Sequence, residues 1–203
     1  MSFFFNPADE IEITRGNLPH WYQKGVYYFV TFRLADSIPK ERAAELKKDR
    51  EDWRKTHKNR IDFSKADWIE YNRLFHDRVE EWLNNGYGSC VLRNSKNAAI
   101  MVDALKYFDH ERYHLDEWVV MPNHVHVLVK PVGDHRLRQI LHSWKSYTSL
   151  QINRNEGRSG ELWMSESFDH IVRSESFLER FRRYIWDNPK KAGIIAPAAS
   201  KGS

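Results

Sequence analysis

Residues 114–130 read HLDEWVVMPNHVHVLVK, and this stretch decides the fold. Two runs rich in valine and aromatic side chains, 114–121 and 124–130, are separated only by Pro122-Asn123. β-Branched and aromatic residues favour strands, and a Pro-Asn pair between two such runs favours a tight turn. The stretch therefore predicts two adjacent antiparallel strands.

The rest of the chain adds one earlier strand and several helices. Residues 26–34 are almost continuously apolar, which is typical of a central strand buried on both faces. Apolar residues spaced three and four apart predict helices elsewhere. These predicted helices cover residues 41–56, 65–84, a segment starting after Asn94, 137–155 and 175–187, with a short extended stretch at 162–172 and Asn188-Pro189 ending the last helix.

This order of elements predicts an α+β domain with the helices segregated to one face of an antiparallel sheet. We expect a single domain over 1–195, with an N-terminal arm at 1–25 that shows no sustained periodicity. The two helices within 39–85 are predicted to form a hairpin inserted after the first strand. The tail at 196–203 is predicted to be disordered.

Composition limits the function classes. The chain has 203 residues, 41% of them apolar and 30% charged, with a formal net charge of +4. This mildly basic balance permits a nucleic-acid partner. The single cysteine, Cys90, excludes an internal disulfide and a multi-cysteine zinc site. No apolar run approaches 18 residues and the start lacks the features of a secretory signal, so we expect a cytoplasmic protein without a membrane partner.

His124 and His126 form the sharpest local feature. Side chains alternate along a strand, so both imidazoles point to one face and can chelate a cation there. One such spacing is ordinary by chance among ten histidines, and two half-exposed histidines on an edge strand remain an alternative. Their strand is otherwise strongly apolar, however, and burying two imidazoles costs free energy unless they are paired or bound to metal.

Tyr147 and Gln151 lie one turn apart in the predicted helix 137–155 and therefore share a face. A phenol and a carboxamide can thus be presented together to the strand that carries the histidines. Taken alone, a helical tyrosine is far more often a packing residue than a nucleophile.

Several segments together resemble the single-tyrosine HUH transposases, and more narrowly the REP-associated tyrosine transposases. The resemblance covers nearly the whole chain in order, with the helical insertion at 39–85 as its least typical part. The segments that carry it are RGNLPHW (15–21), YFVTFR (28–33), PNHVHVLV (122–129), WKSYTSLQIN (144–153), GELW (160–163) and YIWDNPKKAG (184–193).

The resemblance implies a ferredoxin-like sheet and a metal-dependent enzyme that cleaves and rejoins single-stranded DNA beside imperfect palindromic hairpins. It assigns His124, His126 and Gln151 as metal ligands and Tyr147 as the nucleophile, which would form a 5′-phosphotyrosine and release a 3′-hydroxyl. Mg²⁺ or Mn²⁺ is the implied metal, although two imidazoles suit Mn²⁺ better than Mg²⁺. We expect a monomer or homodimer associated with the nucleoid.

Basic residues around the predicted nucleophile helix and the C-terminal helix are candidates for contacts with DNA phosphates. They are Arg136, Arg138, Lys145, Arg154, Arg158, Arg173, Arg182 and Arg183.

A second hypothesis is a ferredoxin-like nucleic-acid-binding module without catalysis. In this alternative, bases stack on the aromatic strand at 27–32. Binding alone does not require the histidine pair, so the sequence favours the enzyme.

Overall fold

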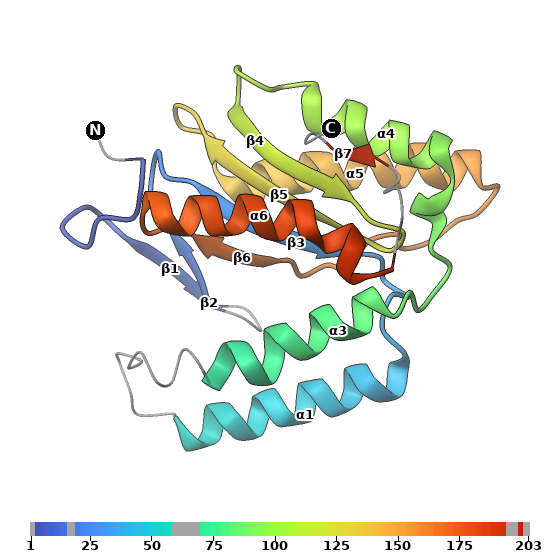
Figure 1. Cartoon of the computed structure of the whole chain (residues 1–203), viewed down its shortest axis with the longest axis horizontal. Coiled ribbons are helices and arrows are strands. Elements are labelled where there is room, and N and C mark those ends of the chain that lie inside the picture. The colour runs from blue at the N-terminus through green and yellow to red at the C-terminus, as the bar shows by residue number, and fades with distance from the viewer. Residues whose placement is uncertain (1–2, 16–18, 58–69, 194–198, 201–203) are drawn as a thin grey trace.

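The computed structural model describes residues 3–15, 19–57, 70–193 and 199–200. Its centre is an antiparallel sheet in the order β6-β3-β5-β4-β7 (Figure 1). Four strands and two helices follow one another as β3-α4-β4-β5-α5-β6, which is the βαββαβ connectivity of a ferredoxin-like fold. The predicted α+β class and its ferredoxin-like sheet are therefore confirmed.

The elements lie close to their predicted ranges. The strands are β1 (Glu12–Arg15), β2 (Pro19–Tyr22), β3 (Tyr28–Arg33), β4 (Tyr113–Val120), β5 (His124–Pro131), β6 (Phe168–Ile171) and β7 (Ala199–Ser200). The helices are α1 (Lys40–Thr56), η1 (Asn72–Asp77), α3 (Arg78–Asn84), η2 (Val91–Arg93), α4 (Ser95–Lys106), α5 (Leu137–Asn155) and α6 (Glu175–Lys191). Residues 65–69 of one predicted helix are outside the described part of the chain.

The two faces of the sheet are covered by different helices. Val125, Val127 and Val129 of β5 pack with α4 and α5 in one apolar cluster. Leu128, from the alternate set of β5 residues, packs with α6 in another. Figure 1 accordingly shows α6 in front of the sheet and α4 and α5 behind it. The expectation that the helices lie on one face of the sheet is therefore wrong, because α6 covers the face opposite α4 and α5.

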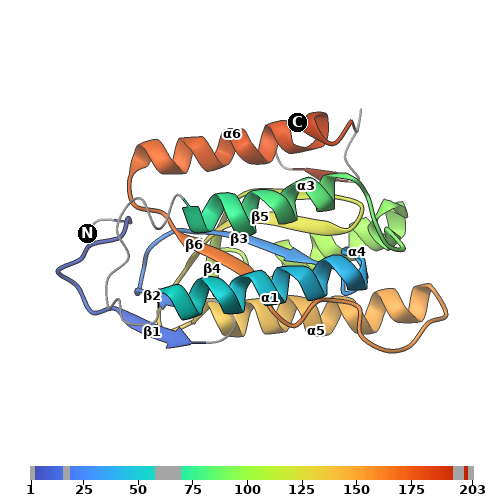
Figure 2. The ribbon, with the colours of Figure 1, turned by 90° about the horizontal axis from the view of Figure 1, so that it is seen from below.

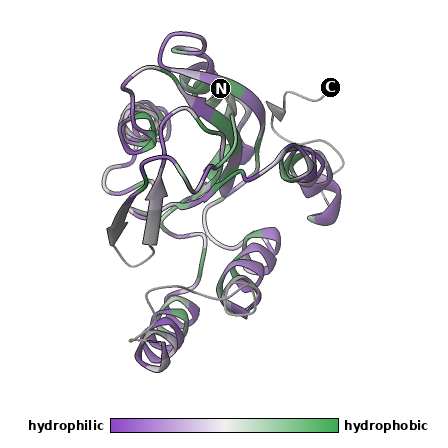
Figure 3. Cartoon of the chain, turned by 90° about the vertical axis from the view of Figure 1, so that its left-hand side faces the viewer, coloured by the Kyte–Doolittle hydropathy of each residue, from purple (hydrophilic) through white to green (hydrophobic). Residues whose placement is uncertain are grey.

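The inserted hairpin forms a separate layer. Its helices α1 and α3 lie side by side beneath the sheet (Figures 2 and 3). They share their own apolar cluster, which includes Leu46, Tyr71, Phe75 and Trp82. The hairpin therefore has a core of its own and approaches the sheet through a limited set of side chains.

Three local features differ from what the sequence suggests. The arm contains a two-stranded hairpin, β1 paired with β2. Pro189 lies inside α6, where Asn188 and Pro189 are both buried, so packing carries the helix past a residue that usually ends one. In the tail, Ala199–Ser200 pair with β4, while 196–198 and 201–203 are outside the described residues.

No helix among the described residues is long and apolar enough to cross a membrane.

Candidate active site

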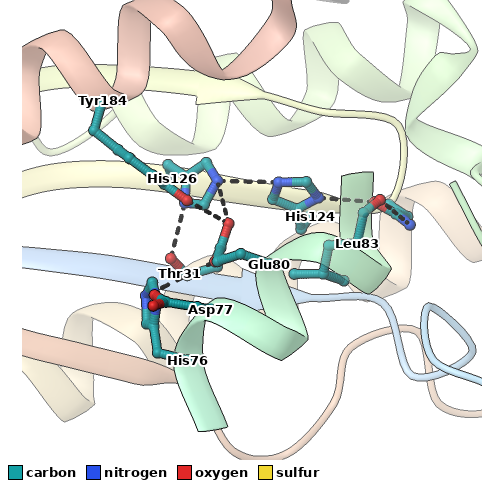
Figure 4. Close-up of polar contacts among 9 residues, drawn as sticks. Thr31, His76, Asp77, Glu80, Leu83, His124, His126 and Tyr184 are labelled. Atoms are coloured by element: carbon teal, nitrogen blue, oxygen red, sulfur yellow. Dashed lines mark hydrogen bonds and ion pairs between the residues drawn. The ribbon is translucent and has the colours of Figure 1, made fainter. Parts of the chain in front are cut away.

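The two histidines of β5 converge as their spacing predicts. Both are fully buried, and their Nε2 atoms are 3.0 Å apart. The Oδ1 atom of Asn123 is 2.8 Å from His124 Nδ1, and the Oγ1 atom of Thr31 is 2.8 Å from His126 Nδ1 (Figure 4). Because each outer nitrogen has a side-chain partner, the rings are held with their Nε2 atoms toward one point.

A carboxylate from the inserted hairpin completes this group. The Oε2 atom of Glu80, on α3, lies 3.5 Å from His126 Nε2. Ligand atoms of Glu80, His124 and His126 all lie within 4.8 Å of one another, and all three residues are buried. Burial raises the pKa of Glu80 and lowers the pKa of both imidazoles, that of His124 to about 3. A buried carboxylate beside two neutral imidazoles is a donor set that fits a divalent cation.

Tyr184 of α6 reaches the same point from the other side. Its hydroxyl donates a 2.5 Å hydrogen bond to Glu80 Oε2, and its ring meets the His126 ring edge-on at 5.3 Å (Figure 4). Burial and the neighbouring Glu80 carboxylate raise the pKa of Tyr184. The phenol is therefore protonated and in contact with the carboxylate of the histidine group.

Asn188 lies one turn after Tyr184 on the same helix. It is fully buried, and neither its Nδ2 nor its Oδ1 atom has a hydrogen-bond partner among the described residues. Burial lowers the pKa of His124, and the nearby Asn188 side chain partly opposes this effect. Asn188 therefore lies beside both His124 and Tyr184, and its side chain makes no well-aligned hydrogen bond among the described residues.

Tyr147 and Gln151 do not join this group. They lie on α5, whose Trp144 and Ile152 pack with the valines of β5 on the face opposite the histidines. Tyr147 is 50% exposed, and no hydrogen bond joins it to the histidine pair. The expectation that Gln151 reaches the histidines is therefore wrong, because the sheet separates α5 from them.

A comparison with known protein families finds one match, which covers part of the chain. Residues 91–188 match the IS200-like transposase family model. This segment belongs to the IS200-like transposases. It contains His124, His126, Tyr184 and Asn188, and it begins after the inserted hairpin that supplies Glu80. A search of curated proteins gives no match.

Two solved structures are similar to this chain in fold. A structure described as a REP-associated tyrosine transposase bound to a REP hairpin is 18% identical, with a TM-score of 0.47, over 89% of this chain and 76% of that one. A protein described as a transposase from Deinococcus radiodurans R1 is 14% identical, with a TM-score of 0.33, over 80% and 90%. Both TM-scores are below 0.5, so we base the function on the family match and on the side chains described above.

The transposase segment also offers a second tyrosine and amide at the spacing that Tyr147 and Gln151 have. Tyr184 and Asn188 have the same four-residue spacing as Tyr147 and Gln151 and also follow the histidine strand. The periodicity of α6 assigns Tyr184 to a buried stripe, and the tyrosine is partly buried, with its hydroxyl turned to Glu80. Glu80 has no such signal, since it is one of many acidic residues in a charged insertion.

The predicted DNA-contact residues of the transposase divide into two groups. Arg136 is paired with Glu12, and Arg182 is paired with Asp116 and Glu179. Lys145 donates to the backbone carbonyls of Met164 and Ser165, and burial lowers its pKa to about 8. Arg138, Arg154, Arg173 and Arg183 are exposed and Arg158 is partly exposed.

The aromatic strand of the alternative hypothesis is not available for stacking. Tyr28, Phe29, Val30 and Phe32 of β3 are at most 1% exposed, since helices cover both faces of the sheet. A module that stacks bases on this strand is therefore not supported by the structure.

Proposed function

We propose that this transposase cleaves and rejoins single-stranded DNA beside imperfect palindromic hairpins, through a 5′-phosphotyrosine intermediate on Tyr184. One observation carries the proposal. The Tyr184 hydroxyl, the Glu80 carboxylate and the Nε2 atoms of His124 and His126 meet at one buried point, and all but Glu80 lie in the transposase segment.

His124, His126 and Glu80 would hold a divalent ion, Mg²⁺ or Mn²⁺. The Oδ1 atom of Asn188, which lies beside His124 and Tyr184, would be a candidate fourth ligand. When bound, such an ion neutralises charge on the scissile phosphate. Glu80 adds the oxygen ligand that both ions favour, which reduces the mismatch between Mg²⁺ and two imidazoles. Gln151 is not part of this donor set.

Tyr184 acts on the phosphorus in this proposal. Its Oη atom forms a bond to phosphorus as the bond from phosphorus to the 3′ oxygen breaks. The departing oxygen takes the electron pair and a proton from water to become a 3′-hydroxyl. A phenol is a poor nucleophile while protonated. Glu80 already accepts the hydrogen bond of this phenol, so we assign it the proton that Tyr184 loses.

The phosphotyrosine retains a phosphodiester, so a 3′-hydroxyl can attack it and join strands without a further energy source. The retained phosphodiester suits strand transfer rather than hydrolysis. The exposed arginines named above are the proposed phosphate contacts, so we expect binding that weakens steeply with salt.

The test is cleavage of a hairpin with single-stranded flanks, on a denaturing gel with Mn²⁺. Wild-type protein should give a covalent protein–DNA adduct, and EDTA should prevent it. His124→Ala should abolish cleavage while hairpin binding remains, and His142→Ala, an exposed histidine on α5, should cleave as the wild type does. Cleavage by the His124 variant, or binding without any adduct in wild type, would refute the enzyme.

A further inference from the structure

A cavity of about 370 Å³ lies between the inserted hairpin and the sheet. Its wall includes Arg50 of α1, Phe75 of η1, Thr31 and Arg33 of β3 and Phe168 of β6. This volume is in the range of pockets that bind small ligands and is sufficient for one nucleotide. It is a second feature, beside the histidine group, for which the insertion is required.

The cavity adjoins the active site directly. Glu80 belongs both to its wall and to the candidate metal group. Thr31, which also lines it, contacts His126, and Arg33 lies opposite His124 in the pairing of β3 with β5. Side chains opposite each other on one face of a sheet are neighbours, so Arg33 lies beside the histidine pair. A ligand in the cavity would therefore be next to the reacting phosphate.

The wall holds both signs of charge: it is lined by Arg33, Lys47 and Arg50 and by Glu51, Glu80 and Glu166. Burial, and then the Arg50 guanidinium, lower the pKa of Arg33 to about 10. Arg50 has its Nη1 atom 4.0 Å from Glu166, while its buried Nε atom has no hydrogen-bond partner among the described residues. Lys145 adds a third partly buried cation nearby. Glu166 offsets part of this positive charge, since it also acts on Arg33 and Lys145. A phosphate, which matches a guanidinium pair well, would offset the rest.

The other walls are apolar and aromatic. Tyr71 and Phe75 line the hairpin side, and Phe168 lines the opposite side, where its ring meets His76 at 4.1 Å. Unpaired bases bind proteins by stacking on aromatic rings while cations hold the backbone. The cavity thus combines the two kinds of contact that a nucleotide of single-stranded DNA needs.

We propose that this cavity binds one unpaired nucleotide of the substrate strand beside the scissile phosphate, with its phosphate on Arg33 and Arg50 and its base against the partly exposed Phe168. The proposal rests on the proposed function for the identity of the strand. It gives the insertion a role in substrate binding, because Arg50 of α1 supplies a phosphate ligand.

Binding can be measured without cleavage. Fluorescein-labelled dT12 is titrated in EDTA with the wild type and with two variants, Arg50→Met and Lys48→Met. Lys48 is the control, because it is an exposed cation on the same helix and does not line the cavity. Loss of one phosphate contact lowers the salt slope for single strands by about 0.7, which is about fivefold in affinity at 0.1 M salt. Arg50→Met should show this loss, and Lys48→Met should stay within about twofold of wild type. Equal losses in both variants, or none in Arg50→Met, would overturn the proposal.

Photocrosslinking locates the nucleotide. With 4-thiothymidine in dT12, crosslinks should fall on the peptide that contains Phe168 and should weaken in Arg50→Met. Crosslinks confined to α5, or a cavity that takes free thymidine monophosphate but gives no crosslink with the strand, would contradict the inference. Cleavage of hairpin DNA without these crosslinks would refute the nucleotide pocket alone, whereas crosslinks without any cleavage would refute the enzyme alone.

Discussion

Glu80 changes the chemistry that a pair of histidines alone would offer. Two imidazoles favour heavier transition ions, whereas a carboxylate oxygen suits Mg²⁺ and Mn²⁺. Glu80 lies within ligand distance of both rings and also accepts the Tyr184 hydrogen bond. One buried carboxylate therefore connects the proposed metal ligands to the proposed nucleophile.

Replacing this carboxylate by an amide tests its place in the donor set. Glu80→Gln keeps the shape but removes the charge, so Mn²⁺ affinity in isothermal titration calorimetry should fall by at least about tenfold. Gln151→Ala, on the opposite side of the sheet, should bind Mn²⁺ as the wild type does. The reverse result would restore Gln151 as the ligand and exclude Glu80.

The sequence predicts the histidines better than their partners. A period of two places His124 and His126 on one face regardless of what covers the sheet. Which tyrosine joins them depends on which helix covers that face, and both Tyr147 and Tyr184 have a helical amide four residues later. Local spacing cannot distinguish these two pairs, because the difference lies in the packing of α5 and α6 on opposite faces.

At the scale of elements, α6 is attached to the sheet by an ion pair as well as by its apolar stripe. Arg182 donates from Nε and Nη2 to the two carboxylate oxygens of Asp116 on β4, at 2.8 and 2.6 Å. This bidentate, partly buried contact fixes the position of the helix that carries Tyr184 and Asn188. Arg182 is thus a positioning residue, although its charge alone predicts a DNA contact.

The neighbouring arginine provides a matched control. Arg182→Met should lower the free energy of unfolding by about 2 kcal/mol, as expected for charge-assisted hydrogen bonds. Arg183→Met, exposed on the same helix, should leave the stability unchanged and weaken DNA binding instead. Urea unfolding and DNA titration measure the two effects, and identical stability losses would show that the ion pair to Asp116 contributes nothing.

Long amphipathic helices and the β4–β5 hairpin are predicted well because their periodicity extends over many residues. The prediction for α5 matches its ends, and α4 begins after Asn94 as expected. The short pairing of β1 with β2 gives no such signal. The continuation of α6 through Pro189 also depends on tertiary contacts, which override local propensity.

At the scale of the molecule, the hairpin of α1 and α3 supplies Glu80 to the candidate site. The apolar core of the sheet domain is formed without this hairpin. The hairpin has an apolar cluster that is separate from the two clusters that flank the sheet. Its polar contacts to the sheet include those of Glu80 with His126 and of the Leu83 carbonyl with Asn123. The insertion therefore modifies the active site more than it supports the fold.

Replacing residues 39–85 by a short Gly-Ser linker tests this separation. The shortened chain should retain cooperative unfolding, with a melting temperature within about 5 °C of wild type. It should lose most of its Mn²⁺ affinity because Glu80 is gone. A shortened chain that binds Mn²⁺ as tightly as the full chain would show that the histidines and the transposase segment suffice.

The most direct test of the account is the position of the DNA adduct. After reaction of wild-type protein with hairpin-flanked single-stranded DNA and Mn²⁺, mass spectrometry of the digested adduct should place the nucleotide on the peptide containing Tyr184. Tyr184→Phe should give no adduct and Tyr147→Phe a full yield, with both variants folded. An adduct on Tyr147, or cleavage that survives Tyr184→Phe, would contradict the assignment of the site to the face of the sheet that α6 covers.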